Sequence, residues 1–210
     1  MNYKNHWATI GVVIALALLF IATTQYPGGS LHDANSVGFQ WQHNYLSNLV
    51  NPKAVNGADN TARPWAVAGV LVLCAAMGLC FFRISRKLPS KGGVAAVTRY
   101  AGTGAMAASV LLATPLHDIG VTISGTLLLL ALFYVTVLLF RTKFHWLKAL
   151  AIVAMLLLYV SAFVYGTRSY LEFLPILQKI NLITTISLLL AVDYLTKADD
   201  FEPSKPAGAS

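Results

Sequence analysis

Long runs of mostly apolar residues alternate with short polar segments along almost the whole chain. Six of these runs approach the length, about 20 residues, that a helix needs to cross the hydrocarbon core of a bilayer. The pattern therefore predicts an all-α fold, a polytopic integral membrane protein with six transmembrane helices in one bundle. The expected spans are roughly residues 7–24, 65–82, 95–114, 119–140, 146–165 and 173–196.

The first apolar run has an alternative interpretation as a signal peptide, with Lys4 as its short basic segment. Its only cleavage-like site, residues 21–24, lacks the small-x-small pattern that signal peptidase prefers. The run is also longer than the usual apolar core of a signal peptide, about 7–15 residues. We therefore interpret it as the first transmembrane span.

Two polar segments define the rest of the organisation. Residues 25–64 form one long loop between the first two spans, which is expected to be extracytoplasmic. Residues 199–210 are polar, contain two prolines and show no periodicity, which is typical of a disordered tail. The sequence thus predicts a membrane domain over residues 1–198, followed by a disordered cytoplasmic tail.

Composition and charge support this class and orient the helices. The chain is 57% hydrophobic and 11% charged, whereas soluble domains carry about 25% charged residues. The net charge of +7 does not indicate a nucleic-acid partner, because the basic residues lie in short segments between apolar runs. Two of these segments, residues 83–99 and 141–148, contain no acidic residue. The positive-inside rule places them and both termini in the cytoplasm, as for a protein of the bacterial inner membrane.

With this topology, three of the five histidines and several charged residues share the extracytoplasmic face. Span six adds Gln178, Asn181 and Thr185 at helical spacing, so a polar stripe runs from that face toward the midplane. We therefore predict an outer pocket for a membrane lipid headgroup or another amphipathic ligand. Its expected ligand-binding residues are His32, Asp33, Asn44, Arg168, Glu172, Gln178, Lys179 and Asn181.

Simpler structural roles explain three of the polar residues, Lys179, Asp118 and Asp193, equally well. Lys179 can extend its ammonium group to the lipid headgroups. Asp118 follows Thr114 and Pro115, and an acidic residue in the first turn is favoured by the helix dipole. Asp193 has Lys197 four residues on, which predicts a local ion pair near the membrane surface.

A membrane-embedded hydrolase acting on a lipid at the same face is the alternative function. If residues 40–49 form a short interfacial helix, His43 and Ser47 lie one turn apart. Together with a nearby carboxylate they have the composition of a nucleophilic site. Zinc is the candidate cofactor, because catalytic zinc sites combine histidines with a carboxylate. The candidate catalytic residues are His43, Ser47, His117 and Asp118, and the candidate metal ligands are His32, His43, His117 and Asp118.

Four short motifs also resemble a known family. They are Tyr26–Gly29 (YPGG), Asn44–Leu49 (NYLSNL), His117–Asp118 and Leu177–Ile180 (LQKI). In layout, the chain resembles the prokaryotic six-helix membrane family called domain of unknown function nine-nine-eight, which is itself similar to Frag/DRAM/Sfk-type proteins. The resemblance implies six helices and no established activity, and an acidic residue is expected in that family where this chain has Asn48.

A more distant likeness is to the ceramidase and progestin-receptor-like superfamily of membrane hydrolases, whose sites combine Ser, Asp and several His. This chain differs from it in having six predicted spans and no His-x-x-x-His pair in the last one. A small transporter or channel is the third alternative. It requires a continuous polar path, whereas the inner half of span six offers mainly Ser187 and Asp193. A ligand-binding membrane protein is therefore the leading hypothesis.

Overall fold

The computed structural model describes residues 6–89 and 93–202, and these residues are predominantly helical. No strand forms within these two ranges, although two isolated β-bridges tie parts of the long loop together. The α-helices are α1 (Trp7–Gln25), α2 (Arg63–Ser85), α3 (Val94–Ser109), α4 (His117–Leu139), α5 (His145–Thr167) and α6 (Leu174–Leu195).

Five of these helices, all except α3, are long and apolar enough to cross a membrane. Helix α3 has 16 residues and continues as a 3-10 helix, η4, over Val110–Ala113. The predicted third span is thus present as an α-helix with a 3-10 extension. The all-helical class is confirmed, and five helices long and apolar enough to span a membrane are compatible with an integral membrane protein.

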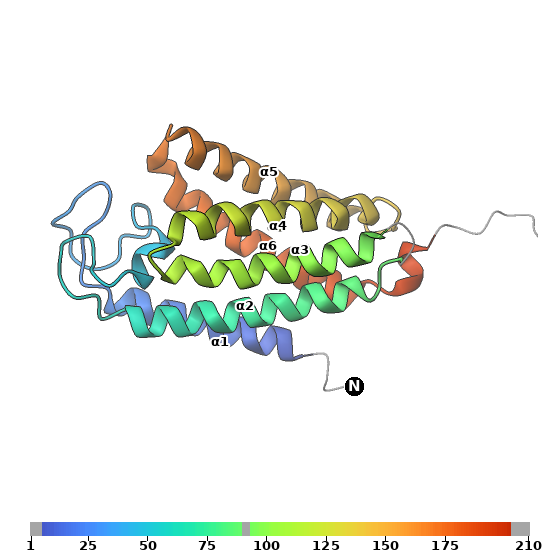
Figure 1. Cartoon of the computed structure of the whole chain (residues 1–210), viewed down its shortest axis with the longest axis horizontal. Coiled ribbons are helices and arrows are strands. Elements are labelled where there is room, and N and C mark those ends of the chain that lie inside the picture. Colours follow the sequence, from blue (N-terminus) through green and yellow to red (C-terminus); the bar gives the residue numbers. More distant parts are fainter. Residues whose placement is uncertain (1–5, 90–92, 203–210) are drawn as a thin grey trace, which may run out of the picture.

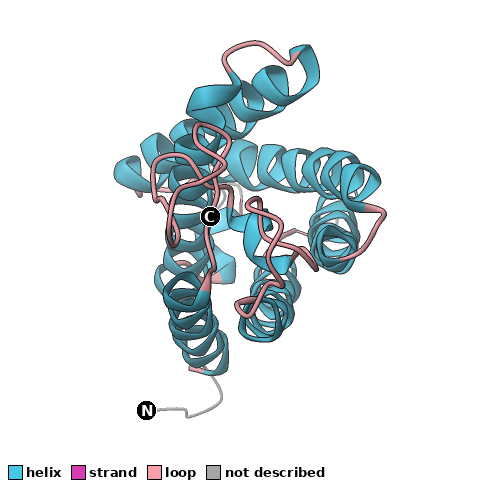
Figure 2. Cartoon of the chain, turned by 90° about the vertical axis from the view of Figure 1, so that its left-hand side faces the viewer, coloured by secondary structure: helices cyan, strands magenta, loops and turns pink. Residues whose placement is uncertain are grey.

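The helices run roughly parallel to one long axis, with the loop of residues 26–62 gathered at one end (Figure 1). We call this end the loop end. The described chain starts and finishes near the other end, where the turns from α2 to α3 and from α4 to α5 also lie (Figure 1). Figure 2, which views the loop end, shows the loop in front of the helix ends and α5 at the margin of the bundle.

Small residues allow close packing between α2 and α3. A Cβ atom added to Gly102 would overlap the side chain of Phe81, which is fully buried. The same atom on Gly104 would meet only Leu127 Cδ1, at 3.4 Å. Gly102 is therefore required at the contact with Phe81, whereas Gly104 has room for a methyl group.

Asp193 is the one buried acidic residue among the described residues. The prediction that it pairs with Lys197 is wrong. Its carboxylate, with 0% of the side chain exposed, lies 3.1 Å from Arg83 Nη2 and 3.4 Å from Lys87 Nζ. The expected pairing with Lys197 requires the helix to continue through that residue, but α6 ends at Leu195. Packing of α6 on α2 instead brings the two basic residues of α2 and its C-terminal turn to the carboxylate.

The predicted disordered tail begins with an ordered turn. Residues Ala198–Phe201 form a 3-10 helix, η6, and the Phe201 side chain is fully buried. Burial of this aromatic ring holds the segment against the bundle. Residues 203–210 of the predicted tail lie outside the described residues.

Candidate ligand-binding site

The long loop is a folded structure organised around Asn44, which is fully buried. Its side-chain oxygen accepts a hydrogen bond from the backbone N–H of Gln40 at 2.7 Å. Its amide nitrogen donates to the carbonyl of Gly29, also at 2.7 Å. A buried amide with both ends paired is typical of a loop-organising residue. The side chain of Asn44, which was predicted to bind a ligand, therefore binds the backbone of its own loop instead.

Asn60 has the same role at the end of the loop. Its amide nitrogen lies 2.8–3.1 Å from the backbone oxygens of Asn48, Leu49 and Asn51. The side-chain oxygen of Asn48 accepts a hydrogen bond from the backbone N–H of Tyr45 at 2.7 Å. An aspartate could accept the same bond, so the acidic residue expected in the resembling family fits this position without a role in chemistry.

Two residues of α6 fix the loop to the bundle. Gln178 Oε1 accepts a hydrogen bond from the backbone N–H of Leu46 at 2.8 Å. Lys179 Nζ donates to the carbonyl oxygens of Asn44 at 2.7 Å and Pro175 at 2.9 Å. It also lies 5.6 Å from the centre of the Phe39 ring. The side chains of Gln178 and Lys179, which were predicted to bind a ligand, therefore bind the backbone of the loop instead.

Asn181, the third predicted residue on α6, lies inside the bundle. Its side chain is 8% exposed, and its nitrogen donates to Ser161 Oγ on α5 at 2.8 Å. This contact joins α5 to α6 below the loop.

His32, Asp33 and His43 lie in the loop away from any catalytic geometry. The rings of His32 and His43 stack with centroids 4.8 Å apart. The Asp33 side chain accepts a hydrogen bond from the backbone N–H of Asn35 at 2.8 Å, as in an Asx turn. Residues 40–49 do not form the helix that would bring His43 to Ser47. A turn is followed by a 3-10 helix, η2, over Leu46–Val50, and no hydrogen bond joins the two side chains in the described chain.

A polar cluster joins the start of α4 to the end of α5. Tyr165 donates a hydrogen bond from its hydroxyl to Asp118 Oδ1 at 2.6 Å, and His117 Nδ1 lies 3.1 Å from the same oxygen. The guanidinium of Arg168 lies 4.8 Å from the centre of the Tyr165 ring. We call these four residues the α4–α5 cluster. Asp118 is 74% exposed and His117 30% exposed at the side chain, so the cluster is open to a ligand.

The turn after α5 holds Arg168 in an unusual backbone conformation. Arg168 has φ 57° and Tyr170 has φ 58°, both in the left-handed region. This conformation costs a residue other than glycine about 1–2 kcal/mol. Such strain is concentrated at functional sites, where the surrounding structure maintains it. Here it ends α5 and places the Arg168 side chain back over the last turn of that helix.

Tyr45 connects this turn to the loop. Its hydroxyl donates a hydrogen bond to the carbonyl of Leu171 at 3.3 Å. Burial raises the pKa of Tyr45, and the positive charge of Arg168 acts in the opposite direction. The loop, the α5–α6 turn and Arg168 are therefore neighbours.

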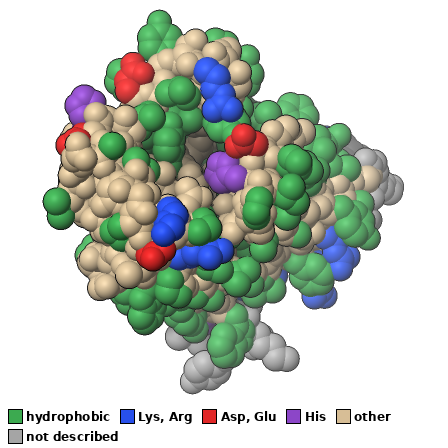
Figure 3. All heavy atoms as spheres, turned by 60° about the vertical axis from the view of Figure 1, so that its left-hand side comes forward, with side chains coloured by type: hydrophobic (Ala, Val, Ile, Leu, Met, Phe, Trp, Pro, Cys, Tyr) green, Lys and Arg blue, Asp and Glu red, His purple; other side chains and the backbone are tan. Residues whose placement is uncertain are grey.

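Residues 115–119 line a cavity of about 360 Å³ at the α4 end of the cluster. Leu116 and Ile119 are 50% and 52% exposed, so an apolar surface lies directly beside the His117 and Asp118 side chains. Figure 3 shows this face of the molecule hollowed near its centre, with histidine, acidic and basic side chains around the hollow. The lining suits an amphipathic molecule better than a purely polar one.

The predicted site residues thus form separate groups. His32 and His43 form one pair and His117 and Asp118 another. In the ranges 6–89 and 93–202, no three His, Cys, Asp or Glu side chains gather as a metal site would require. Glu172 is exposed in the 3-10 helix η5 (Leu171–Phe173) and forms no ion pair within those ranges.

Tyr165 is the site residue that sequence reasoning missed. It lies 47 residues from Asp118, and a tyrosine at the end of a span is ordinarily explained by the aromatic belt of membrane proteins. Only the packing of α5 beside α4 reveals its contact with the carboxylate.

Searches for similar proteins among family models, curated proteins and solved structures found no match to this chain.

Proposed function

We propose that the α4–α5 cluster binds the headgroup of a membrane lipid or similar amphipathic ligand that carries both an amine and an anionic group. The observation that supports this most strongly is the fixed and exposed carboxylate of Asp118. Its contacts with Tyr165 and His117 both use Oδ1. Oδ2 is then available to accept hydrogen bonds from a ligand ammonium group, and charge-assisted bonds of this kind are strong.

Arg168 supplies the complementary charge. A guanidinium presents several N–H groups in a planar fork that matches a phosphate or carboxylate. The guanidinium lies over the Tyr165 ring, and the hydroxyl of the same tyrosine contacts Asp118. The cluster therefore presents a positive group and a negative group, both next to Tyr165, which matches the two charges of a zwitterionic headgroup.

The location of the cluster supports a lipid in particular. Helix α4 begins at His117 and α5 ends at Thr167, so the cluster lies where two apolar helices end. A lipid headgroup at the bilayer surface occupies the same level. The exposed side chains of Leu116 and Ile119 would contact the start of its acyl chains.

The hydrolase alternative has less support. A nucleophilic mechanism requires a serine within hydrogen-bond reach of its base, and Ser47 and His43 do not form that contact in the described chain. We therefore propose binding without a chemical step.

The test compares lipid binding by the purified protein and its Asp118→Asn variant, measured by native mass spectrometry with phosphatidylethanolamine as the probe. Asparagine keeps an acceptor for Tyr165 but removes the charge. We expect phosphatidylethanolamine affinity to fall about tenfold, or about 1.4 kcal/mol, with thermal stability unchanged. Asp59→Asn is the matched control, because Asp59 is also an exposed carboxylate at the loop end, 89% exposed at its side chain, and lies outside the cluster. Equal affinity of the two variants would contradict the proposal.

A further inference from the structure

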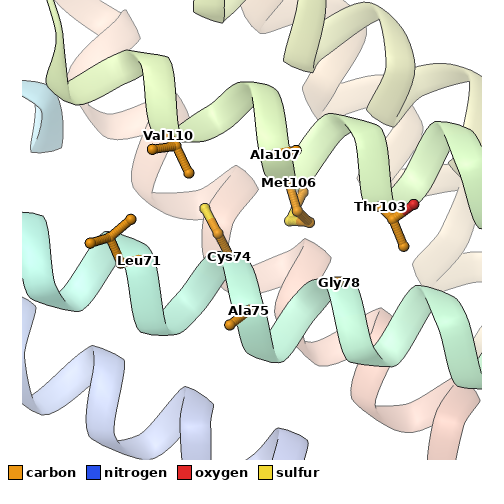
Figure 4. Close-up of a pocket in the computed structure, with 8 residues that line it drawn as sticks. All are labelled: Leu71, Cys74, Ala75, Gly78, Thr103, Met106, Ala107 and Val110. Atoms are coloured by element: carbon orange, nitrogen blue, oxygen red, sulfur yellow. The ribbon is translucent and has the colours of Figure 1, made fainter.

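A second site lies on the side of the bundle between α2 and α3, near the middle of α2. A groove of about 290 Å³ opens there between Cys74, Ala75 and Gly78 of α2 and Thr103, Ala107 and Val110 on the α3 side (Figure 4). Ala75 and Ala107 are exposed, so the groove faces the surroundings of the bundle. At this depth a transmembrane helix is surrounded by acyl chains.

Small side chains keep this groove open. A Cβ atom added to Gly78 would contact only Met106, at an ordinary 3.9 Å. One helical turn closer to the α2–α3 turn the helices close up, because Gly102 packs directly on Phe81. The groove therefore has a closed end at this point and continues toward Leu71 and Val110.

A cation lies at the closed end. Phe82 follows Gly78 by one helical turn, and Arg99 precedes Thr103 by one turn, so both extend the walls of the groove. The Arg99 guanidinium lies 4.3 Å from the centre of the Phe82 ring. The side chain is half-buried, and within the described residues it forms no ion pair. The acidic group at this end, Asp193, is already paired with Arg83 and Lys87.

An apolar groove that ends at an unneutralised cation has the chemistry of an anionic phospholipid site. We propose that an anionic phospholipid binds here, with one acyl chain along the α2–α3 groove and its phosphate at Arg99. The exposed Arg86, the C-cap residue of α2, lies one helical turn beyond Phe82 and adds a second positive charge toward the same end of the bundle. Cationic side chains near a bilayer surface attract anionic lipid headgroups.

Other occupants fit less well. A helix from a second copy would place side chains in the groove, but its apolar side chains would leave Arg99 without an anion. The predicted orientation also places this end in the cytoplasmic leaflet, where anionic lipids are abundant. The site is independent of the α4–α5 cluster, which lies at the loop end.

The experiment measures phosphatidylglycerol binding to the full chain in detergent by native mass spectrometry. Arg99→Gln removes the charge, and Arg141→Gln is its control in the other basic segment. Gly78→Leu fills the groove, and Gly125→Leu is its control, because a Cβ on Gly125 meets nothing within 4 Å. We expect Arg99→Gln and Gly78→Leu each to weaken binding at least about fivefold, and both controls to bind as the unmodified chain does.

Two further arms make the result specific. Glycerol phosphate, which lacks acyl chains, is expected not to displace the lipid, and Asp59→Asn, at the loop end, is expected to leave phosphatidylglycerol binding unchanged. If Gly78→Leu does not fold, Ala107→Leu fills the same groove from α3. Equal binding by Arg99→Gln and Arg141→Gln, or by the groove-filling variant and Gly125→Leu, would overturn the proposal.

Discussion

Replacing Asp193 by asparagine should destabilise the bundle more than any change of an exposed acidic residue. The carboxylate is fully buried and compensates two cations, Arg83 at 3.1 Å and Lys87 at 3.4 Å. Removing one partner of a buried ion pair leaves the other charge uncompensated, which costs about 3–5 kcal/mol. The two cations are 18% and 21% exposed, so solvent offsets part of this cost. We therefore expect a loss of about 3 kcal/mol, the lower end of that range.

The assay is unfolding by sodium dodecyl sulfate in mixed micelles, followed by tryptophan fluorescence. Asp199→Asn is the matched control, because Asp199 is exposed in η6, only a few residues away. The control should lie within about 0.5 kcal/mol of the unmodified chain. Lys197→Ala should behave like the control, since Lys197 lies beyond the end of α6. The reasoning would be refuted if Asp193→Asn unfolded at the same detergent fraction as Asp199→Asn.

Two further variants test the loop and the helix packing. Asn44→Leu removes the hydrogen bonds to the backbone of residues 29 and 40 and should cost about 2–4 kcal/mol, seen as faster proteolysis within residues 26–62. The exposed Asn35→Leu should leave cleavage unchanged. Gly102→Ala should destabilise the protein by about 1–3 kcal/mol through overlap with Phe81. Gly104→Ala should melt at or above the temperature of the unmodified chain, and the opposite order of the two alanine variants would contradict the packing described.

The helices were predictable because apolar runs of membrane length leave few alternatives. Five of the six predicted spans correspond to long α-helices within a few residues at each end. The third span differs because its last turn tightens into the 3-10 helix η4 before Thr114. Hydropathy reports burial in lipid and carries no information on the hydrogen-bond pattern of a helix end.

The roles of the polar residues were harder to predict from the sequence. Asn44, Gln178 and Lys179 stood out as candidate ligand contacts, and all three bind the loop backbone. A long loop must satisfy its own peptide groups, and the nearest polar side chains serve that need first. Tyr165 gave no signal at all, because its partner Asp118 belongs to a different helix.

The ion-pair partners of Asp193 were equally hard to predict from the sequence. Spacing along one helix suggested Lys197, whereas the observed partners Arg83 and Lys87 belong to α2 and the turn after it. An i, i+4 rule applies only within a continuous helix. Contacts between helices that are distant in sequence require the packing itself.

The most direct test of the proposed headgroup site is photo-cross-linking with a phosphatidylethanolamine that carries its photoreactive group near the amine. We expect adducts on peptides that contain residues 115–119 or 165–170, reduced by unlabelled phosphatidylethanolamine and by Asp118→Asn. Adducts spread evenly over the lipid-facing helices, or unchanged in Asp118→Asn, would contradict a headgroup site at the α4–α5 cluster.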